Sequence, residues 1–319
     1  MPLYSSDYQP RFIFKNGHIS TIYSGLFREV EGVQQIRERL ELADGDFLDL
    51  DWSFARKKTD KVVVLLHGLE GNAQRPYMLG SAKYLNTKGL DCCSVNFRGC
   101  SGETNRLFRS YHSGATEDLD AVVQYILSDK KYRSIFLKGF SLGGNMALKY
   151  LGERTVPKSI KGAIGISVPC DLHDSLLQLL KFKNTLYAKR FKNHLIAKLE
   201  EKKKSFPELL SDSDIKKIKT LKDFDDLYTS KAHGFKDAID YYNTCSSQQF
   251  LANIKTPTLI VNALNDSFLG RNCYPLKEAE VNPKLFLNLP KYGGHVGFPD
   301  AQNLSYPEKI GYKFLKETF

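Results

Sequence analysis

Three residues of this chain have types and surroundings suited to nucleophilic catalysis. Ser141 lies in the stretch "GFSLG", which fits the pattern G-x-S-x-G, and Asp266 and His295 follow it along the chain. A serine hydroxyl is a weak nucleophile until a neighbouring base takes its proton. A histidine held in one tautomer by a carboxylate is such a base. We therefore expect Ser141 to attack, His295 to accept the proton and Asp266 to orient the imidazole.

The G-x-S-x-G pattern alone is weak evidence, because chance places it in roughly one chain in ten of this length. Its context is more specific. The apolar stretch "SIFL" precedes it, and the helix-like run "GGNMALKYL" follows it. A strained turn between a strand and a helix raises a serine hydroxyl above the sheet, and glycines allow the close backbone approach. The context favours a nucleophile over the alternative, a small residue in an ordinary tight turn.

The acid and the base each follow a late apolar run. The run "TPTLIVNA" precedes Asp266, and "LFLNL" precedes His295. Parallel strands end at one edge of a sheet, and ligands bind outside that edge. If both runs are strands, the two side chains converge on Ser141. Asp171, in "SVPCDLHD", also ends a predicted strand and is the alternative acid.

A tetrahedral intermediate needs hydrogen-bond donors for its oxyanion. The backbone N–H of Leu142, directly after the serine, is one candidate. The N–H of Leu69 in "LLHGLEGN" is the other, because Gly68 leaves room for it to face the oxyanion. Two histidines are candidates for shaping or lining the pocket: His67 in the same loop and His112 in "RSYHSG".

Predicted strands alternate with predicted helices, which indicates an α/β fold. Polar and apolar residues alternate around Asp44-Gly45 and predict a β-hairpin over 37–52. Apolar runs predict buried strands at 61–68, 90–97, 134–138, 161–168, 257–263 and 285–289. Helices are predicted at 76–88, 113–129 with Ser113 as N-cap, 142–152 and from about Ala301. This order builds a mostly parallel sheet with helices on both faces.

Residues 171–250 differ in texture from the rest of the chain. They contain no convincing buried strand and are rich in Lys, Leu and Phe. An apolar stripe recurs every four residues at Tyr187, Phe191, Leu195 and Leu199. We expect a helical cap here, inserted between core segments 1–170, with an N-terminal extension 1–36, and 251–319. The alternative is a helical layer unrelated to any site.

Composition is that of a globular protein, with 42% hydrophobic and 26% charged residues in 319. No apolar run approaches the roughly 18 residues that span a bilayer. The first residues lack the apolar core of a signal peptide, so the cytoplasm is the expected location. The six cysteines have no paired spacing and are expected to be reduced. No motif for a metal or a cofactor is present, and none is expected.

The net charge of +10 is partly local. Between Lys181 and Lys204, nine Lys or Arg residues stand against two Glu. Such a run is either a solvated helix face or a surface for an anionic partner. No stacking-aromatic motif accompanies it, so nucleic acid is not an expected partner. Peripheral contact with anionic membrane surfaces is a hypothesis, and the sequence points to no particular oligomeric state.

Taken together, the chain resembles the α/β-hydrolases, and within them the YheT-like branch. The resemblance covers nearly the full length and rests on "NGHISTIY", "HGLEGN", "GFSLGGN", "SVPCDL" and "GGHVGF". Its most specific part is the segment from Asp225 to Asp266. The resemblance implies Ser141, Asp266 and His295 as a catalytic triad. It also implies hydrolysis of carboxylic esters, of an acyl or lipid-like kind, without a cofactor.

Other functions remain open for these residues. A thioesterase or an acyltransferase would use the same triad, and the acyl acceptor would distinguish them. An amide hydrolase has no supporting feature in the sequence. A non-catalytic binding protein on this fold would normally lack part of the triad, whereas all three residue types are present here.

Overall fold

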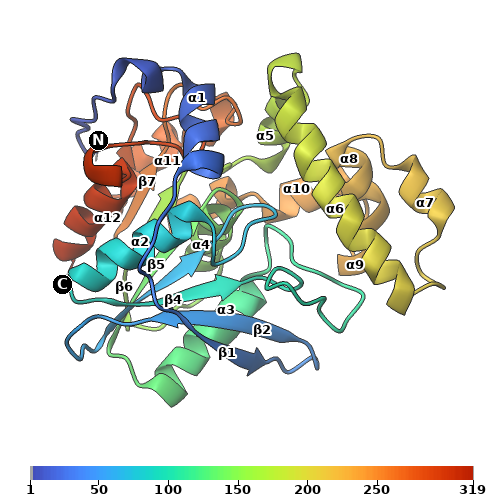
Figure 1. Ribbon diagram of the computed structural model, residues 1–319, viewed down its shortest axis with the longest axis horizontal. Helices are drawn as coiled ribbons and strands as arrows, with labels where there is room; N and C mark the ends of the chain where they lie inside the picture. The colour runs from blue at the N-terminus through green and yellow to red at the C-terminus, as the bar shows by residue number, and fades with distance from the viewer. Residues whose placement is uncertain (1–2, 319) are drawn as a thin grey trace.

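Runs of Val, Ile and Leu form the central strands of one eight-stranded sheet in the computed structural model, which describes residues 3–318 (Figure 1). The strands are β1 (Ile36–Glu41), β2 (Phe47–Ser53), β3 (Lys61–Leu66), β4 (Asp91–Asn96), β5 (Ser134–Phe140), β6 (Ile160–Ile166), β7 (Thr258–Val261) and β8 (Leu285–Asn288). Their order in the sheet is β1-β2-β4-β3-β5-β6-β7-β8. Only the pairs β1–β2 and β2–β4 are antiparallel, so the predicted mostly parallel sheet is confirmed.

Helices cover both faces of the sheet, as the alternation of elements predicts. The core helices are α2 (Pro76–Thr87), α3 (Thr116–Tyr125), α4 (Leu142–Glu153), α11 (Leu276–Val281) and α12 (Tyr306–Lys316). Buried residues of α3, α4 and α11 pack in one apolar cluster, and those of α2 and α12 pack in another. The adjacent residues Cys92 and Cys93 fall in different clusters, because neighbouring side chains of a strand point to opposite faces.

The segment between β6 and β7 is helical and stands to one side of the sheet (Figure 1). Its helices are α5 (Leu172–Leu179), α6 (Thr185–Ser205), α7 (Asp212–Lys217), α8 (Leu221–Phe224), α9 (Ser230–His233) and α10 (Ala238–Cys245). We call this segment the cap. It has its own apolar cluster, which includes Leu195 and Leu199 from the predicted stripe. Tyr187 and Phe191, the other two residues of the stripe, are half-buried.

Three details differ from the sequence predictions. Ser113 does not cap a helix: α3 begins at Thr116, and the Ser113 N–H donates to the Tyr241 hydroxyl instead (3.0 Å). The last helix, α12, begins at Tyr306 rather than near Ala301, because Ser305 and Glu308 form a capping box there. The N-terminal extension also contains an unpredicted helix, α1 (Gly17–Ile22), whose first N–H groups are capped by the Asn16 side chain.

Within residues 3–318, no helix combines the length and the apolar character that crossing a bilayer requires.

Lys138 on β5 has an uncommon position, because its side chain is only 1% exposed. The ammonium donates to the carbonyl of Pro307 (3.2 Å), and burial lowers its pKa to about 8. The unfolded chain keeps its proton up to the usual lysine pKa near 10.4. Between these values the unfolded state binds more protons, so this group's contribution to stability rises with pH.

We predict that Lys138→Met removes this rise and stabilises the protein at pH 7 by about 1–3 kcal/mol, because a charge no longer has to be desolvated. Urea unfolding at a series of pH values from 7 to 10 measures both effects. Lys161→Met on β6, where the side chain is exposed, is the control and should leave the pH dependence unchanged. A Lys138→Met protein with the wild-type pH dependence would contradict the assignment.

Candidate active site

Ser141 occupies a strained turn between the end of β5 and the start of α4. Its backbone has φ 50° and ψ −117°, a region that non-glycine residues rarely adopt. The Ser141 N–H donates to the carbonyl of Ile166 on β6 (2.8 Å), which ties the turn to the sheet. A Cβ on Gly139 would lie 2.2 Å from the Gly143 carbonyl oxygen, so strand and helix can approach this closely only with glycine there. The turn directs the serine hydroxyl away from the sheet and toward His295, as the sequence predicts.

His295 connects Ser141 and Asp266 in one hydrogen-bonded chain. His295 Nδ1–H donates to Asp266 Oδ2 at 2.8 Å, and Nε2 lies 2.9 Å from the Ser141 hydroxyl. The carboxylate is an acceptor only, so it selects the tautomer in which Nε2 is free to accept the serine proton. The Asp266 side chain is fully buried, and that of His295 is 10% exposed.

The loop carrying His295 is held by side chains from three distant parts of the chain. The His295 N–H donates to Thr21 Oγ1 on α1 (2.8 Å). The flanking N–H groups of Gly294 and Val296 donate to Asn265 (3.0 Å) and Ser167 (2.9 Å). The N-terminal extension therefore takes part in positioning the imidazole.

An aromatic contact fixes the imidazole ring from the other side. The ring of Phe268 stacks on His295, with centroids 4.3 Å apart. Tyr187 and Phe191 of α6 in turn contact Phe268, at 4.8 and 6.2 Å between centroids. The aromatic half of the predicted cap stripe thus packs on the residue that covers the histidine.

The loop after β3 passes close to Ser141. A Cβ added to Gly68 would lie 3.3 Å from Ser141 Cβ, so a larger residue would press on the serine. The Gly68 N–H donates to the Tyr77 hydroxyl (3.1 Å), which holds the loop in place. Leu69 and Leu142, the two predicted oxyanion donors, both line the cavity that contains Ser141. Leu142 is the first residue of α4, where backbone N–H groups have no partner within the helix.

Glu70, the residue after Leu69, links this loop to the cap. Tyr111 accepts from the Glu70 N–H (2.9 Å) and donates to its carboxylate (2.7 Å). Lys198 of α6 pairs with the same carboxylate at 2.9 Å, and Arg75 donates to the Glu70 carbonyl (2.9 Å). Glu70 has a positive φ of 53°, and these contacts compensate for that strain.

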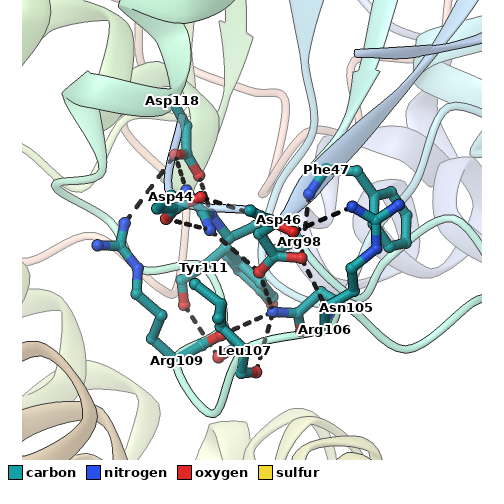
Figure 2. Close-up of polar contacts among 12 residues, drawn as sticks. Asp44, Asp46, Phe47, Arg98, Asn105, Arg106, Leu107, Arg109, Tyr111 and Asp118 are labelled. Atoms are coloured by element: carbon teal, nitrogen blue, oxygen red, sulfur yellow. Dashed lines mark hydrogen bonds and ion pairs between the residues drawn. The ribbon is translucent and has the colours of Figure 1, made fainter. Parts of the chain in front are cut away.

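A buried charge cluster supports the loop that carries Tyr111 (Figure 2). Arg98 pairs with Asp118 at 2.6 Å, with Asp44 at 2.8 Å and with Asp46 at 3.0 Å. The Arg98 side chain is 2% exposed, and burial raises the pKa of Asp118 even though that carboxylate is paired with Arg98. Asn105 also donates to Asp46 (2.6 Å), so the loop following β4 is fastened to the hairpin β1–β2.

Asp171, the alternative acid, lies outside the Ser141–His295–Asp266 chain. Its carboxylate accepts from the Asp174 N–H (2.9 Å), as the N-cap of α5, and from the Asn272 side chain (3.0 Å). A short acidic residue at the start of a helix satisfies a free N–H, which explains why an aspartate stands there.

The two candidate pocket histidines differ in position. His112 lines the cavity, whereas His67 is not among its lining residues and lies beside Gly68 in the loop after β3. His67 is fully buried: Nδ1–H donates to the Gly68 carbonyl (2.8 Å), and Nε2 accepts from the Phe97 N–H (3.2 Å). Burial lowers the pKa of both histidines to about 3, so they are neutral in the folded protein.

The cavity at Ser141 has a volume of about 510 Å³ and lies between the carboxyl edge of the sheet and the cap. Ser141 and His295 open into it from the sheet side. Apolar residues of the cap that line it include Leu172, Leu176, Leu179, Phe191, Leu195, Leu199 and Phe224. This volume lies within the range of cavities that bind small-molecule ligands.

A scan against protein-family models matches residues 61–302 to the α/β-hydrolase fold family. The chain belongs to this family. The match covers the serine turn, the acid and the histidine, and the eight-stranded sheet has the corresponding mostly parallel arrangement.

Several curated proteins are similar over most of the chain. "Putative esterase YheT" of Escherichia coli is 35% identical over 298 residues, which cover 92% of this chain and 87% of that protein. "Phospholipase ABHD3" of Mus musculus is 27% identical over 99% of this chain and 79% of its own length. "Monoacylglycerol lipase" of Saccharomyces cerevisiae is 30% identical over 80% of this chain and 59% of its own length.

Solved structures show the same fold at lower identity. The Pyrococcus furiosus esterase Pf2001 superposes with a TM-score of 0.63 at 18% identity, covering 91% of this chain and 96% of that one. Est1E from Butyrivibrio proteoclasticus gives 0.57 at 15% identity, with 89% and 98% covered. At these identities the likeness concerns the arrangement of sheet and helices.

Several side chains around the site were not anticipated from the sequence. Glu70, Tyr77 and Phe268 each lie within nine residues of a predicted site residue, but no pattern of residue types marks them. Thr21 and Lys198 reach the site from segments far away in the sequence. The nearness of Glu70 to Leu69 and of Phe268 to Asp266 is the local signal that the sequence offers for these contacts.

We predict that Arg98→Met lowers the free energy of unfolding by about 3–5 kcal/mol, because it leaves Asp46 and Asp118 buried without their partner. Urea unfolding measures the change. The control is Arg106→Met, whose exposed pair with Glu41 should be worth less than about 1 kcal/mol. Equal losses in the free energy of unfolding for the two variants would show that the buried cluster around Arg98 does not stabilise the loop after β4.

Proposed function

We propose that the protein is a serine hydrolase that cleaves carboxylic esters through an acyl-enzyme on Ser141. The observation that carries the proposal is the hydrogen-bonded chain Ser141–His295–Asp266 beneath a cavity. The esterase and lipase names of the relatives support the reaction class.

Acylation follows from the positions of the three side chains. Ser141 Oγ attacks the ester carbonyl while its proton moves to His295 Nε2, and the Asp266 carboxylate stabilises the imidazolium. The backbone N–H groups of Leu69 and Leu142 are the proposed donors to the oxyanion, aided by the positive end of α4. When the tetrahedral intermediate collapses, the C–O bond to the alcohol breaks and His295 gives the alcohol its proton.

Deacylation reverses the same proton transfers. Water gives a proton to His295 Nε2 and attacks the acyl carbonyl, and the proton then returns to Ser141 Oγ as the acid leaves. The stacking of Phe268 on the imidazole keeps Nε2 directed at the serine during both steps.

The cavity supports a substrate with an acyl chain or another apolar group. Eight of the cap residues that line it are Leu or Phe, and burying an apolar group against them is favoured by roughly 0.8 kcal/mol per methylene. The names of the phospholipase and monoacylglycerol lipase relatives agree with a lipid-like ester.

Transfer of the acyl group to an alcohol is the second candidate. A yeast relative, 28% identical over 80% of this chain, is named "Medium-chain fatty acid ethyl ester synthase/esterase 2". The same acyl-enzyme serves both reactions, and the ratio of free acid to transferred ester in water–alcohol mixtures measures the preference.

We predict that a fluorophosphonate probe labels the wild-type protein and fails to label Ser141→Ala, because the Ser141 hydroxyl is the one hydrogen-bonded to His295 Nε2. Turnover of a panel of esters should be lost in the same variant. Circular dichroism controls for folding. Labelling that persists in Ser141→Ala would place the nucleophile elsewhere.

We predict that Asp266→Asn lowers kcat by about three to four orders of magnitude, because an amide stabilises the wrong tautomer of His295. Asp171→Asn is the matched control, since asparagine still caps a helix, and its kcat should stay near that of the wild type. Steady-state kinetics on a soluble ester distinguishes the two. The reverse pattern would make Asp171 the acid.

A further inference from the structure

Exposed apolar side chains are concentrated on two segments that also contribute lining residues to the cavity. We call the following residues the rim: Phe12, Ile13, Ile19, Ile22, Leu26 and Phe27 from the N-terminal segment, with Leu177, Leu180, Phe182 and Leu186 from the cap. Phe182 is 96% exposed, Phe12 88% and Leu186 81%. Large apolar side chains of this kind are usually buried in a folded protein. Exposed apolar residues that gather in this way mark an interaction surface.

The two halves of the rim face each other across the cavity. Ile22 and Leu26 line the cavity from the N-terminal segment, and Leu179 and Tyr187 line it from the cap. His18 and Tyr187 join the halves, with His18 Nδ1 3.2 Å from the Tyr187 hydroxyl. Figure 1 shows α1 and the turn between α5 and α6 at the same edge of the molecule. A surface that covered the rim would therefore cover the entrance to the active site.

The charge of the rim segments has one sign. Residues 8–28 contain no Asp or Glu, and neither do residues 175–199. The cations of the second segment are Lys181, Lys183, Lys189, Arg190, Lys192 and Lys198. Within residues 3–318, Lys198 alone among these six forms an ion pair with a carboxylate.

The structure divides the basic run seen in the sequence into two parts. The cations in the second half of α6 have partners within the protein. Lys198 pairs with Glu70, and Lys202 donates to the carbonyls of Asn105 and Leu107. Lys203 pairs with Glu200 and Asp212, and Lys204 with Glu201. The first half, next to the exposed rim, is the part whose charge is free to act on a partner.

We propose that the rim docks on the surface of an anionic lipid bilayer, with its apolar side chains inserted among the lipids and its cations at the headgroups. Apolar insertion and headgroup attraction add, and basic residues near an anionic leaflet favour binding. Docking depends on the rim and its cations and does not require that the protein hydrolyse esters. The passage of lipid esters from the bilayer into the cavity rests on the proposed function.

The charge distribution favours a bilayer over a second copy of the chain. A two-fold dimer through the rim would place the same cationic segments face to face, and this repulsion would oppose association. An anionic bilayer supplies the opposite charge and an apolar interior together.

The test measures sedimentation of Ser141→Ala protein with vesicles of phosphatidylcholine containing about one third phosphatidylglycerol. The Ser141→Ala substitution prevents hydrolysis of the lipid by Ser141, so that the assay measures binding alone. We expect binding that weakens as salt rises, because salt screens the headgroup attraction. Introducing Phe182→Ser and Leu186→Ser into the Ser141→Ala protein should weaken vesicle binding about ten-fold or more.

The matched control adds Ile36→Ser and Phe54→Ser, which replace two apolar residues 65% and 52% exposed. Ile36 lies on β1 and Phe54 directly follows β2, at the edge of the sheet opposite α1 in Figure 1. Binding should be unchanged. Lys183→Gln with Lys189→Gln should weaken binding at low salt and have little effect at high salt.

Equal binding of the rim and control variants would overturn the proposal, and so would equal, salt-insensitive binding to pure phosphatidylcholine. A concentration-dependent dimer that Phe182→Ser disperses would also overturn it. With Ser141 intact, the rim variant should hydrolyse a water-soluble short-chain ester at the wild-type rate. A wild-type protein that binds vesicles but hydrolyses no ester would refute the proposed function and leave the docking proposal intact.

Discussion

The strained turn at Ser141 is the constraint on which the rest of the site depends. A positive φ at a non-glycine residue costs of order 1–3 kcal/mol, and it persists here because β5 lies between β3 and β6 in the middle of the sheet. Once the turn is set, the Leu142 N–H, the axis of α4 and the serine hydroxyl have fixed directions. The loops of Gly68 and His295 are then positioned against a rigid reference.

A second constraint is electrostatic and connects the core with the cap. The buried Arg98 pairs with three carboxylates, and two of these, Asp46 and Asp118, are buried with it, where an unpaired charge would be costly. The loop it supports carries Tyr111, which fixes Glu70 next to Leu69. Glu70 then pairs with Lys198 of the cap. Packing of the cap and placement of a proposed oxyanion donor therefore share one carboxylate.

Helix α6 serves two environments along its length. Its second half is tied to the core by Lys198 and Lys202. Its first half carries the exposed Leu186 and cations that form no ion pair with a carboxylate of residues 3–318. Between them, Tyr187 and Phe191 pack on Phe268 and so reach His295. Aromatic packing thus holds the middle of this helix against the ring that covers His295.

The sequence by itself determined the sheet class, the serine turn and the order of serine, acid and histidine, because these depend on short local patterns at the ends of strands. Only the tertiary structure decided that Asp266 rather than Asp171 meets His295, and that His67 is buried away from the cavity. Thr21 and Lys198 likewise meet the site from distant segments. Such contacts depend on strand order and on how the cap packs, which no local pattern encodes.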